Sequence, residues 1–219
     1  NPDVVFVASA LNDHLRAEQN WYASSDLSFV EYGALQLLDE RFGGCRELSG
    51  FNVALFRALG IPCGIDRVVQ NPHRIGSHMW TFMVDTDGRK LPYLWNYYNI
   101  DREERMEEKY GKVYRDYFSV QTTNWAVSYP DEDIPGILKN PFLRDVSDEY
   151  FGRNVAVVPL YDSAGDGRLC YLAVFNNAGW SPVAVGTAAG FQGVFNNIDT
   201  AIVYLPVYHR EGKLTAGGD

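Results

Sequence analysis

Apolar residues in the first sixty positions recur every three or four residues, the spacing that lines one face of a helix. This pattern predicts helices over residues 4–18, 28–41 and 45–59. Gly43-Gly44 requires a turn before the third helix. Gly60 suits the left-handed residue that ends a helix, and Pro62 cannot continue one. The beginning of the chain is therefore expected to be mostly helical.

Beyond Pro62 the pattern changes to short runs of aromatic and β-branched residues, which predict strands. The predicted strands are 63–69, 77–85 and 90–95. Between the last two lies Asp87-Gly88, a pair that favours a tight hairpin turn. The segment Asp85-Thr86-Asp87-Gly88 also resembles the start of a calcium loop, but no Glu follows at the twelfth position, so a hairpin explains it better. Helices followed by antiparallel strands predict an α+β fold.

The second half of the chain divides into a punctuated stretch and a run of strands. Residues 102–109 are dense in charge and predict a helix with a solvated face. Residues 129–141 contain three prolines, which predict a linker or a long loop. Strands are then predicted over 155–160, 169–176, 182–186, 191–195 and 201–208. Short strands at this spacing indicate a small β-sandwich-like module, so we predict domains over 1–148 and 149–219.

Composition and charge exclude several classes of partner. The chain has 219 residues, of which 46% are hydrophobic and 21% charged, as in ordinary globular domains. A net charge of −9 argues against nucleic acid, because phosphate binding requires clustered Lys and Arg. No apolar run approaches the length of a membrane span. The chain starts at Asn1 without a Met or a signal-like core, so we expect an excised or mature segment.

The cysteines and histidines do not suggest a metal centre. Three cysteines are an odd number in a long chain, so they do not form a disulfide framework. Cys63 and Cys170 lie in strand-like runs and are expected in the core. No Cys or His pair has the spacing of a zinc site, so we expect neither a metal nor a cofactor. In the β-module, Phe175, Trp180 and Tyr204 could line a ligand face, with core packing as the alternative.

Cys45 follows two glycines at the predicted start of a helix. Unpaired N–H groups and the helix dipole at such a position favour the thiolate form. The glycines allow a sharp turn and leave room beside the sulfur for a carbonyl group. The N–H groups of the turn could also hold the oxyanion of a tetrahedral intermediate. Cys45 is therefore a candidate nucleophile, and a buried, inert thiol is the competing interpretation.

His78 begins the second predicted strand, where alternation places it on one face with Trp80, Phe82 and Val84. A histidine on an apolar face is often a satisfied core residue. Thiol catalysis, however, needs an imidazole that accepts the proton and returns it to the leaving amine. A thiol at a helix start and an imidazole on the following hairpin supply both groups, so His78 is the candidate base.

A third residue would orient the imidazole of the base. Asn96 follows the returning strand of the predicted hairpin, which brings residues 95–97 back level with 78–80. Asn96 is the candidate, and an ordinary turn residue is the alternative interpretation. Asp101 could reach the imidazole through a loop, whereas Asp85 lies at the far end of the hairpin.

These residues resemble a known family. Phe42-Gly43-Gly44-Cys45-Arg46-Glu47-Leu48, followed by residues 55–62, resembles the core motif of the transglutaminase-like superfamily. Ser77-His78-Met79-Trp80 resembles the second motif of that superfamily, a His followed two residues later by Trp. The resemblance covers about residues 27–99. Residues 114–208 further resemble the downstream part of bacterial secreted proteins that join such a core to a β-module.

The resemblance implies a transglutaminase-like, papain-like core with a Cys-His-Asp arrangement, in which Cys45 is the nucleophile and His78 the base. The chain departs from the family at the third position, where Leu94-Trp95-Asn96 stands in place of the usual Asp. Asn can orient an imidazole but stabilises the imidazolium less than a carboxylate. The resemblance also implies an extracytoplasmic location, in the periplasm or at the cell surface.

Two functions are compatible with these features. The first is a cysteine hydrolase or acyltransferase that attacks an amide or peptide carbonyl through an acyl-enzyme. Hydrolysis is favoured over cross-linking, because nothing in the sequence indicates an amine-acceptor site. The substrate would be a peptide, a protein or a peptidoglycan-like polymer. The second is a catalytically weak or inactive protein that binds a peptide or a glycan, the glycan on the β-module.

Overall fold

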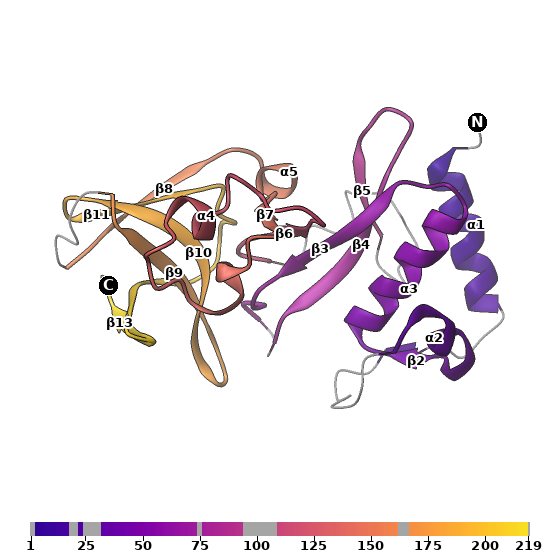
Figure 1. The fold of residues 1–219 in the computed structure, drawn as a ribbon, viewed down its shortest axis with the longest axis horizontal. Helices are drawn as coiled ribbons and strands as arrows, with labels where there is room; N and C mark the ends of the chain where they lie inside the picture. The colour runs from indigo at the N-terminus through magenta and orange to yellow at the C-terminus, as the bar shows by residue number, and fades with distance from the viewer. Residues whose placement is uncertain are drawn as a thin grey trace. The chain divides into compact units, whose positions relative to one another are not determined.

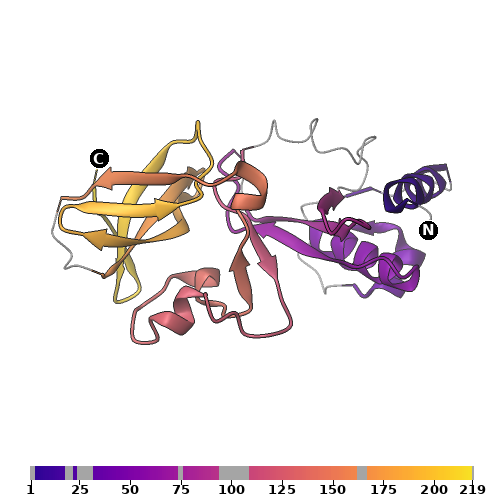
Figure 2. The ribbon, with the colours of Figure 1, turned by 90° about the horizontal axis from the view of Figure 1, so that it is seen from above.

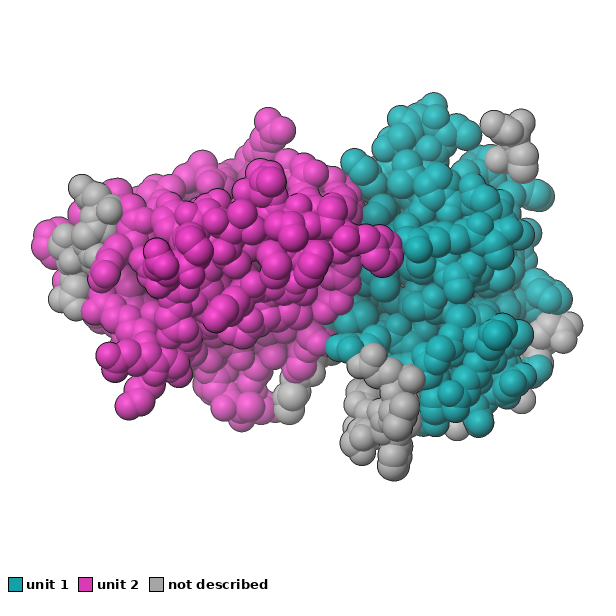
Figure 3. Space-filling view, in the orientation of Figure 1, with its two compact units in different colours: residues 1–66, 78–108 teal, residues 67–77, 109–219 magenta. Residues whose placement is uncertain are grey.

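The computed structural model describes residues 3–17, 22–23, 32–73, 76–93, 109–161 and 167–218. The chain forms two compact units, coloured separately in Figure 3. Unit 1 comprises residues 1–66 and 78–108, and unit 2 comprises residues 67–77 and 109–219. The predicted division into an α+β core over 1–148 and a β-module over 149–219 stays a prediction.

Unit 1 contains the helices and the hairpin predicted from the first hundred residues. Its elements are α1 Val4–Ala17, β1 Tyr22–Ala23, α2 Ala34–Glu40, β2 Phe42–Gly43, α3 Cys45–Ala58, β3 Cys63–Val68, β4 His78–Val84 and β5 Lys90–Tyr93. Strand β3 extends past Asp66, the last residue of unit 1 in that segment. Residues 28–31 of the predicted second helix and 102–108 of the predicted charged helix lie outside the described residues.

An apolar core joins the two longer helices of unit 1 to the hairpin β4–β5 (Figure 1). Its buried members are Ala8, Phe56, Ile61, Met83 and Tyr93. Strands β4 and β5 pair antiparallel, from Thr81 opposite Tyr93 to Val84 opposite Lys90. Gly88 takes a φ of +79° in the connecting turn, which confirms the predicted hairpin.

Unit 2 is dominated by antiparallel strands. Its elements are β6 Tyr114–Asp116, α4 Trp125–Ser128, the 3-10 helix η2 Gly136–Lys139, β7 Leu143–Asp145, α5 Asp148–Phe151, β8 Val155–Pro159, β9 Leu169–Asn176, β10 Gly179–Ala189, β11 Gln192–Asn196, β12 Tyr204–Arg210 and β13 Lys213–Ala216. The last six strands form one sheet in the order β13-β12-β9-β10-β11-β8. Strand β10 starts before the predicted position, and its register with β9 shifts next to Pro182, which has no N–H to donate to the ladder.

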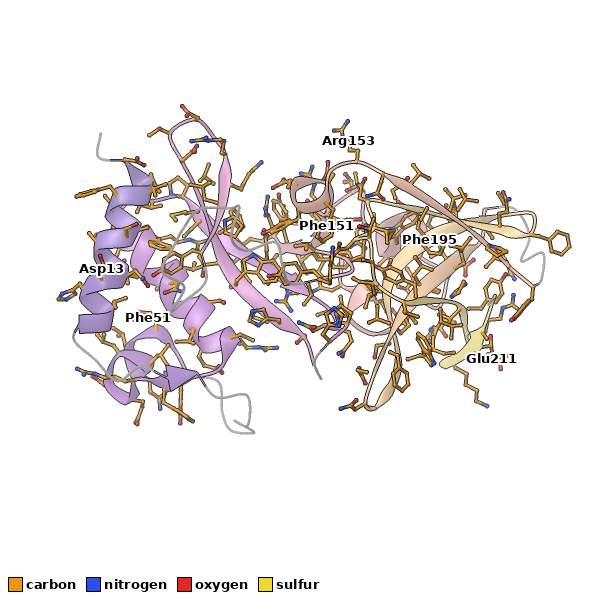
Figure 4. All side chains as sticks on the ribbon, turned by 180° about the vertical axis from the view of Figure 1, so that it is seen from behind. Asp13, Phe51, Phe151, Arg153, Phe195 and Glu211 are labelled. Carbon is orange, nitrogen blue, oxygen red and sulfur yellow. The ribbon has the colours of Figure 1, made fainter. Side chains whose placement is uncertain are left out.

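Strand β9 is buried on both faces. Its alternate residues Cys170, Leu172 and Val174 enter one core, which also holds the completely buried Phe195 labelled in Figure 4. The intervening residues Leu169, Tyr171 and Ala173 enter a second core with Tyr114, Ile134, Leu138 and Leu143. Residues 129–141, predicted as a linker or long loop, contain the short 3-10 helix η2 and cover this second face of the sheet through Ile134 and Leu138.

The six-stranded sheet, drawn in orange and yellow in Figure 2, is curled, and the chain just beyond its two outer strands, β8 and β13, is joined by a hydrogen bond. Just beyond β8, the Tyr161 N–H donates to the carbonyl of Gly217, which follows β13, at 2.6 Å. A Cβ at Gly218 would lie 2.3 Å from the Pro159 carbonyl oxygen, so the close approach requires glycine. The module predicted as β-sandwich-like is therefore a single curled sheet, whose second face is covered by residues 109–148. The α+β class is confirmed.

Candidate active site

The turn before Cys45 is built from two glycines for two different reasons. Gly43 is buried, and a Cβ there would lie 2.8 Å from Glu47 Cβ and 2.9 Å from Leu37 Cδ1. Gly44 is the extended residue that caps α3, and its N–H donates to Glu47 Oε2 at 2.9 Å. The first turn of the helix is thereby fixed by its own third residue.

Cys45 is the first residue of α3, is half-buried and is not in a disulfide. The first N–H groups of a helix have no intrahelical acceptor and point out of its N-terminus. An anion beside the Cys45 sulfur, or an oxyanion formed on a bound carbonyl, would therefore face these donors. The structure places Cys45 at the helix start predicted from the sequence.

The other two cysteines have the properties of core residues. Cys170 is buried, and burial raises the pKa of its thiol to about 12. Burial also raises the pKa of the Cys63 thiol, opposed by the nearby Arg57. The Cys63 thiol donates to the Val53 carbonyl at 3.6 Å. Both thiols are therefore expected to be protonated and unreactive at neutral pH.

His78 is the first residue of β4 and is half-buried. Its ring lies beside that of Trp80, with centroids 5.8 Å apart, so the two alternate residues project from the same face of the strand. Thr81 projects from the other face, toward α3.

Helix α3 and strand β4 are joined by two buried hydrogen bonds. Ser49 Oγ donates to the Met79 carbonyl at 3.3 Å, and Thr81 Oγ1 donates to the Ser49 carbonyl at 3.3 Å. Further along both elements, Phe56 and Met83 share the same core. The helix and the strand therefore run in the same direction, with Cys45 and His78 at their corresponding ends. Sequence reasoning missed Ser49, although it lies one helical turn after Cys45.

The candidates for the third residue are only partly described. Asn96 and Asp101 lie outside the described residues. Asp85 forms an ion pair with Arg89 at 2.6 Å and accepts the N–H groups of Asp87 and Arg89. It stabilises the hairpin turn at the end of β4 opposite His78 and is not an orienting residue.

The three aromatic residues proposed to line a ligand face differ in position. Phe175 and Trp180 lie opposite each other on β9 and β10, 54% and 37% exposed, with ring centroids 5.3 Å apart. Tyr204 is half-buried, its hydroxyl donates to the Asp199 carbonyl at 3.0 Å, and burial raises its pKa. Only the first two are therefore available to a ligand.

No cluster of three or more His, Cys, Asp or Glu side chains able to hold a metal occurs in the described part of the chain. Of the helices that the structure describes, none is long and apolar enough to cross a membrane.

Comparison with known proteins finds a family similarity in the N-terminal part of the chain. Residues 2–95 match the family model described as the Transglutaminase-like superfamily, which generally contains cysteine enzymes. Neither curated proteins nor solved structures give a significant match. The matched segment runs from α1 to β5 and includes both Cys45 and His78. This match confirms the resemblance to the transglutaminase-like superfamily over residues 2–95, which the two motifs predicted.

Proposed function

We propose that the transglutaminase-like segment is a cysteine enzyme, with Cys45 as nucleophile and His78 as base. The observation that supports this most is the hydrogen bond from Ser49 to Met79. Ser49 lies one helical turn after Cys45, and Met79 directly follows His78. The bond therefore ties together the two chain segments that carry the candidate groups.

The proposed reaction is hydrolysis of an amide or peptide bond through an acyl-enzyme. His78 takes the thiol proton as Cys45 Sγ bonds to the carbonyl carbon, and the N–H groups at the start of α3 hold the oxyanion. The tetrahedral intermediate collapses with loss of the C–N bond, and His78 returns the proton to the departing amine. Water then attacks the thioester, with His78 again as base, and releases the acid and the free thiol.

Asn96 is proposed as the residue that orients His78. In the β4–β5 ladder the numbers of paired residues add up to 174, as in Thr81 with Tyr93 and Met83 with Leu91. Asn96 follows the last described residue of this hairpin, Tyr93, by three positions in the sequence. Its side-chain carbonyl would accept a hydrogen bond from one imidazole N–H and leave the other nitrogen for Cys45.

A peptide, a protein or a peptidoglycan-like polymer is the proposed substrate, since each contains the amide carbonyl that the mechanism requires. An extracytoplasmic site of action, in the periplasm or at the cell surface, is proposed with it. Fractionation of the native host would test the location, and a pool confined to the cytoplasm would contradict it.

Site-resolved alkylation of the native protein tests the catalytic proposal. We expect iodoacetamide to modify Cys45 at a rate that changes little between about pH 6 and 8, as for a thiolate held by an imidazolium. Cys63 and Cys170 are the internal controls. His78→Ala should restore the tenfold rise per pH unit of an ordinary thiol. The proposal is wrong if Cys45 in the unaltered protein already shows that rise.

A second candidate function, binding of a glycan, is favoured by Phe175 and Trp180. Two exposed, adjacent aromatic rings on a rigid hairpin provide the apolar platform on which a sugar ring can stack. Trp180 fluorescence should then change on titration with soluble peptidoglycan fragments, and Phe175→Ala should weaken the affinity. Leu214→Ala, which removes an exposed apolar residue from β13, should leave the affinity unchanged. No fluorescence change at millimolar ligand would reject this function.

A further inference from the structure

We infer that Ser49 and Thr81 are positioning residues, which set the alignment of the Cys45 thiol with the His78 imidazole. This inference rests on the proposed function, because alignment matters only if the two groups act together. It adds two residues that neither family motif contains.

The two hydroxyls form a reciprocal pair between α3 and β4. Ser49 Oγ donates to the Met79 carbonyl, and Thr81 Oγ1 donates to the Ser49 carbonyl, each at 3.3 Å. Ser49 is 4% exposed and Thr81 is completely buried. Ser49 therefore sits between Met79 and Thr81 along the strand, and a shift of the helix in either direction would lengthen at least one of the two bonds.

Cys45 and His78 lie at similar distances along α3 and β4 from the Ser49–Thr81 pair. Cys45 lies four residues before Ser49, a rise of about 6 Å along a helix. His78 lies two residues before position 80, the middle of the hydrogen-bonded segment, a rise of about 6.6 Å along a strand. Since α3 and β4 run in the same direction, the two steps end level with each other.

Apolar packing elsewhere on α3 cannot supply the same precision. The helix also contacts the core through residues such as Phe56, but burial depends on area and has no preferred direction. Hydrogen bonds weaken steeply with misalignment. The hydroxyl pair is the directional contact nearest to Cys45 along α3 among the hydrogen bonds described between this helix and β4.

A simpler explanation is that the two hydroxyls only satisfy buried polar groups. A control substitution at an equally buried hydroxyl distinguishes this explanation from a positioning role. Ser147 is completely buried in unit 2, where its hydroxyl accepts the Val113 N–H at 3.0 Å and donates to the Val113 carbonyl at 3.3 Å. Ser147→Ala therefore removes an equally buried hydroxyl that has no part in the proposed site.

The first readout is the pH profile of Cys45 alkylation. Ser49→Ala and Thr81→Val should each lower the rate below neutral pH by about 10- to 100-fold, since a misplacement of about 1 Å can cost about 100-fold in rate. Ser147→Ala should leave the profile unchanged. Thr81→Ser retains the donor and should restore the rate of the unaltered protein.

The second readout measures alignment without catalysis. In His78→Cys, the introduced thiol can form a disulfide with Cys45 under a glutathione redox buffer, a bond that needs Cα atoms about 4.4–6.8 Å apart. Adding Ser49→Ala should lower the effective concentration of the two thiols at least about tenfold. Adding Ser147→Ala should not change it.

The combined outcomes distinguish this inference from the proposed function. If Cys45 is alkylated as an activated thiol and neither Ser49→Ala nor Thr81→Val changes its rate or the disulfide equilibrium, the inference is wrong and the proposed function stands. If Cys45 is alkylated like an ordinary thiol but the disulfide equilibrium depends on Ser49, the proposed function is wrong and the alignment role is supported. An equal response to Ser147→Ala in both readouts means that lost stability is the cause, and the inference fails.

Discussion

The two units hold their segments together in different ways. In unit 1, side-chain hydrogen bonds cross between elements, from Ser49 to Met79, from Thr81 to Ser49 and from Tyr93 to Asn12. In unit 2, β9 is covered on both faces by apolar residues. Side-chain bonds such as Tyr114 to Val183 also cross between elements there, and a backbone bond joins Tyr161 to Gly217. Directional bonds fix position, whereas burial stabilises in proportion to area. In unit 1 the Ser49–Thr81 pair therefore fixes alignment next to the candidate site, whereas in unit 2 the apolar cover on both faces of β9 contributes stability.

The largest effect should come from a buried ion pair in unit 2. Lys112 is 3% exposed, forms an ion pair with Asp145 and donates to the Asn196 carbonyl at 2.8 Å. Asp145→Asn leaves this buried ammonium without its counter-charge and should lower the free energy of unfolding by about 3–5 kcal/mol. Urea titration at pH 7 measures the change. Lys112 also donates to the Asn197 carbonyl at 3.3 Å, and a loss below about 1 kcal/mol would show that these two carbonyls suffice to hold the ammonium.

The same variant has a predicted pH dependence. Burial lowers the pKa of Lys112 from the ordinary value of 10.5, and Asp145 opposes that shift. Between the lowered pKa and 10.5 the unfolded chain binds more protons than the folded one, so Lys112 makes stability rise with pH in this window. Asp145→Asn lowers the pKa of Lys112 further and should extend the rise toward neutral pH. Unfolding from pH 7 to 10 checks the slope.

Gly186→Ala should break the close packing of unit 2. The added Cβ would lie 2.4 Å from the Val194 carbonyl oxygen and 2.5 Å from the ring of the completely buried Phe195. Neither neighbour is the end of a flexible side chain, so we expect a loss of about 3 kcal/mol in the free energy of unfolding. Retention of the original urea midpoint would contradict the packing described for β10 and β11.

A matched pair of cysteine substitutions compares the units directly. Cys170→Ser puts a hydroxyl into an apolar core and should cost about 1–3 kcal/mol, because the group has to be desolvated. Cys45→Ser changes a half-buried residue at a helix start and should alter stability by less than about 0.5 kcal/mol. Parallel urea titrations give both values. Equal losses would mean that Cys45 is a core residue.

The smallest effect should be a gain in unit 1. Gly50 lies on the exposed side of α3, and a Cβ there would meet no atom within 4 Å. Gly50→Ala should therefore raise the free energy of unfolding by about 0.5–1 kcal/mol, the difference in helix propensity. Thermal unfolding followed by circular dichroism is the measurement. A decrease would indicate that the position contacts another part of the chain.

The sequence predicted local features well because each depends on residues close together in the chain. Helix periodicity and the glycines gave the start of α3 at Cys45, and Gly60 takes the left-handed conformation expected of it, with a φ of +75°. The Asp-Gly pair gave the hairpin that follows His78. The transglutaminase-like resemblance is confirmed over residues 2–95. The alignment of Cys45 with His78 and the role of Asn96 stay predictions.

Only the tertiary structure decided how these elements are held. The curling of the last sheet depends on the meeting of Tyr161 with Gly217, and the cover over β9 depends on residues 109–148. The Ser49–Thr81 pair joins positions 32 residues apart. The spacing of apolar residues identifies a helix or a strand because side chains return to the same face with the period of that element. The position of one element against another depends on contacts between distant residues, for which the sequence has no periodic signal.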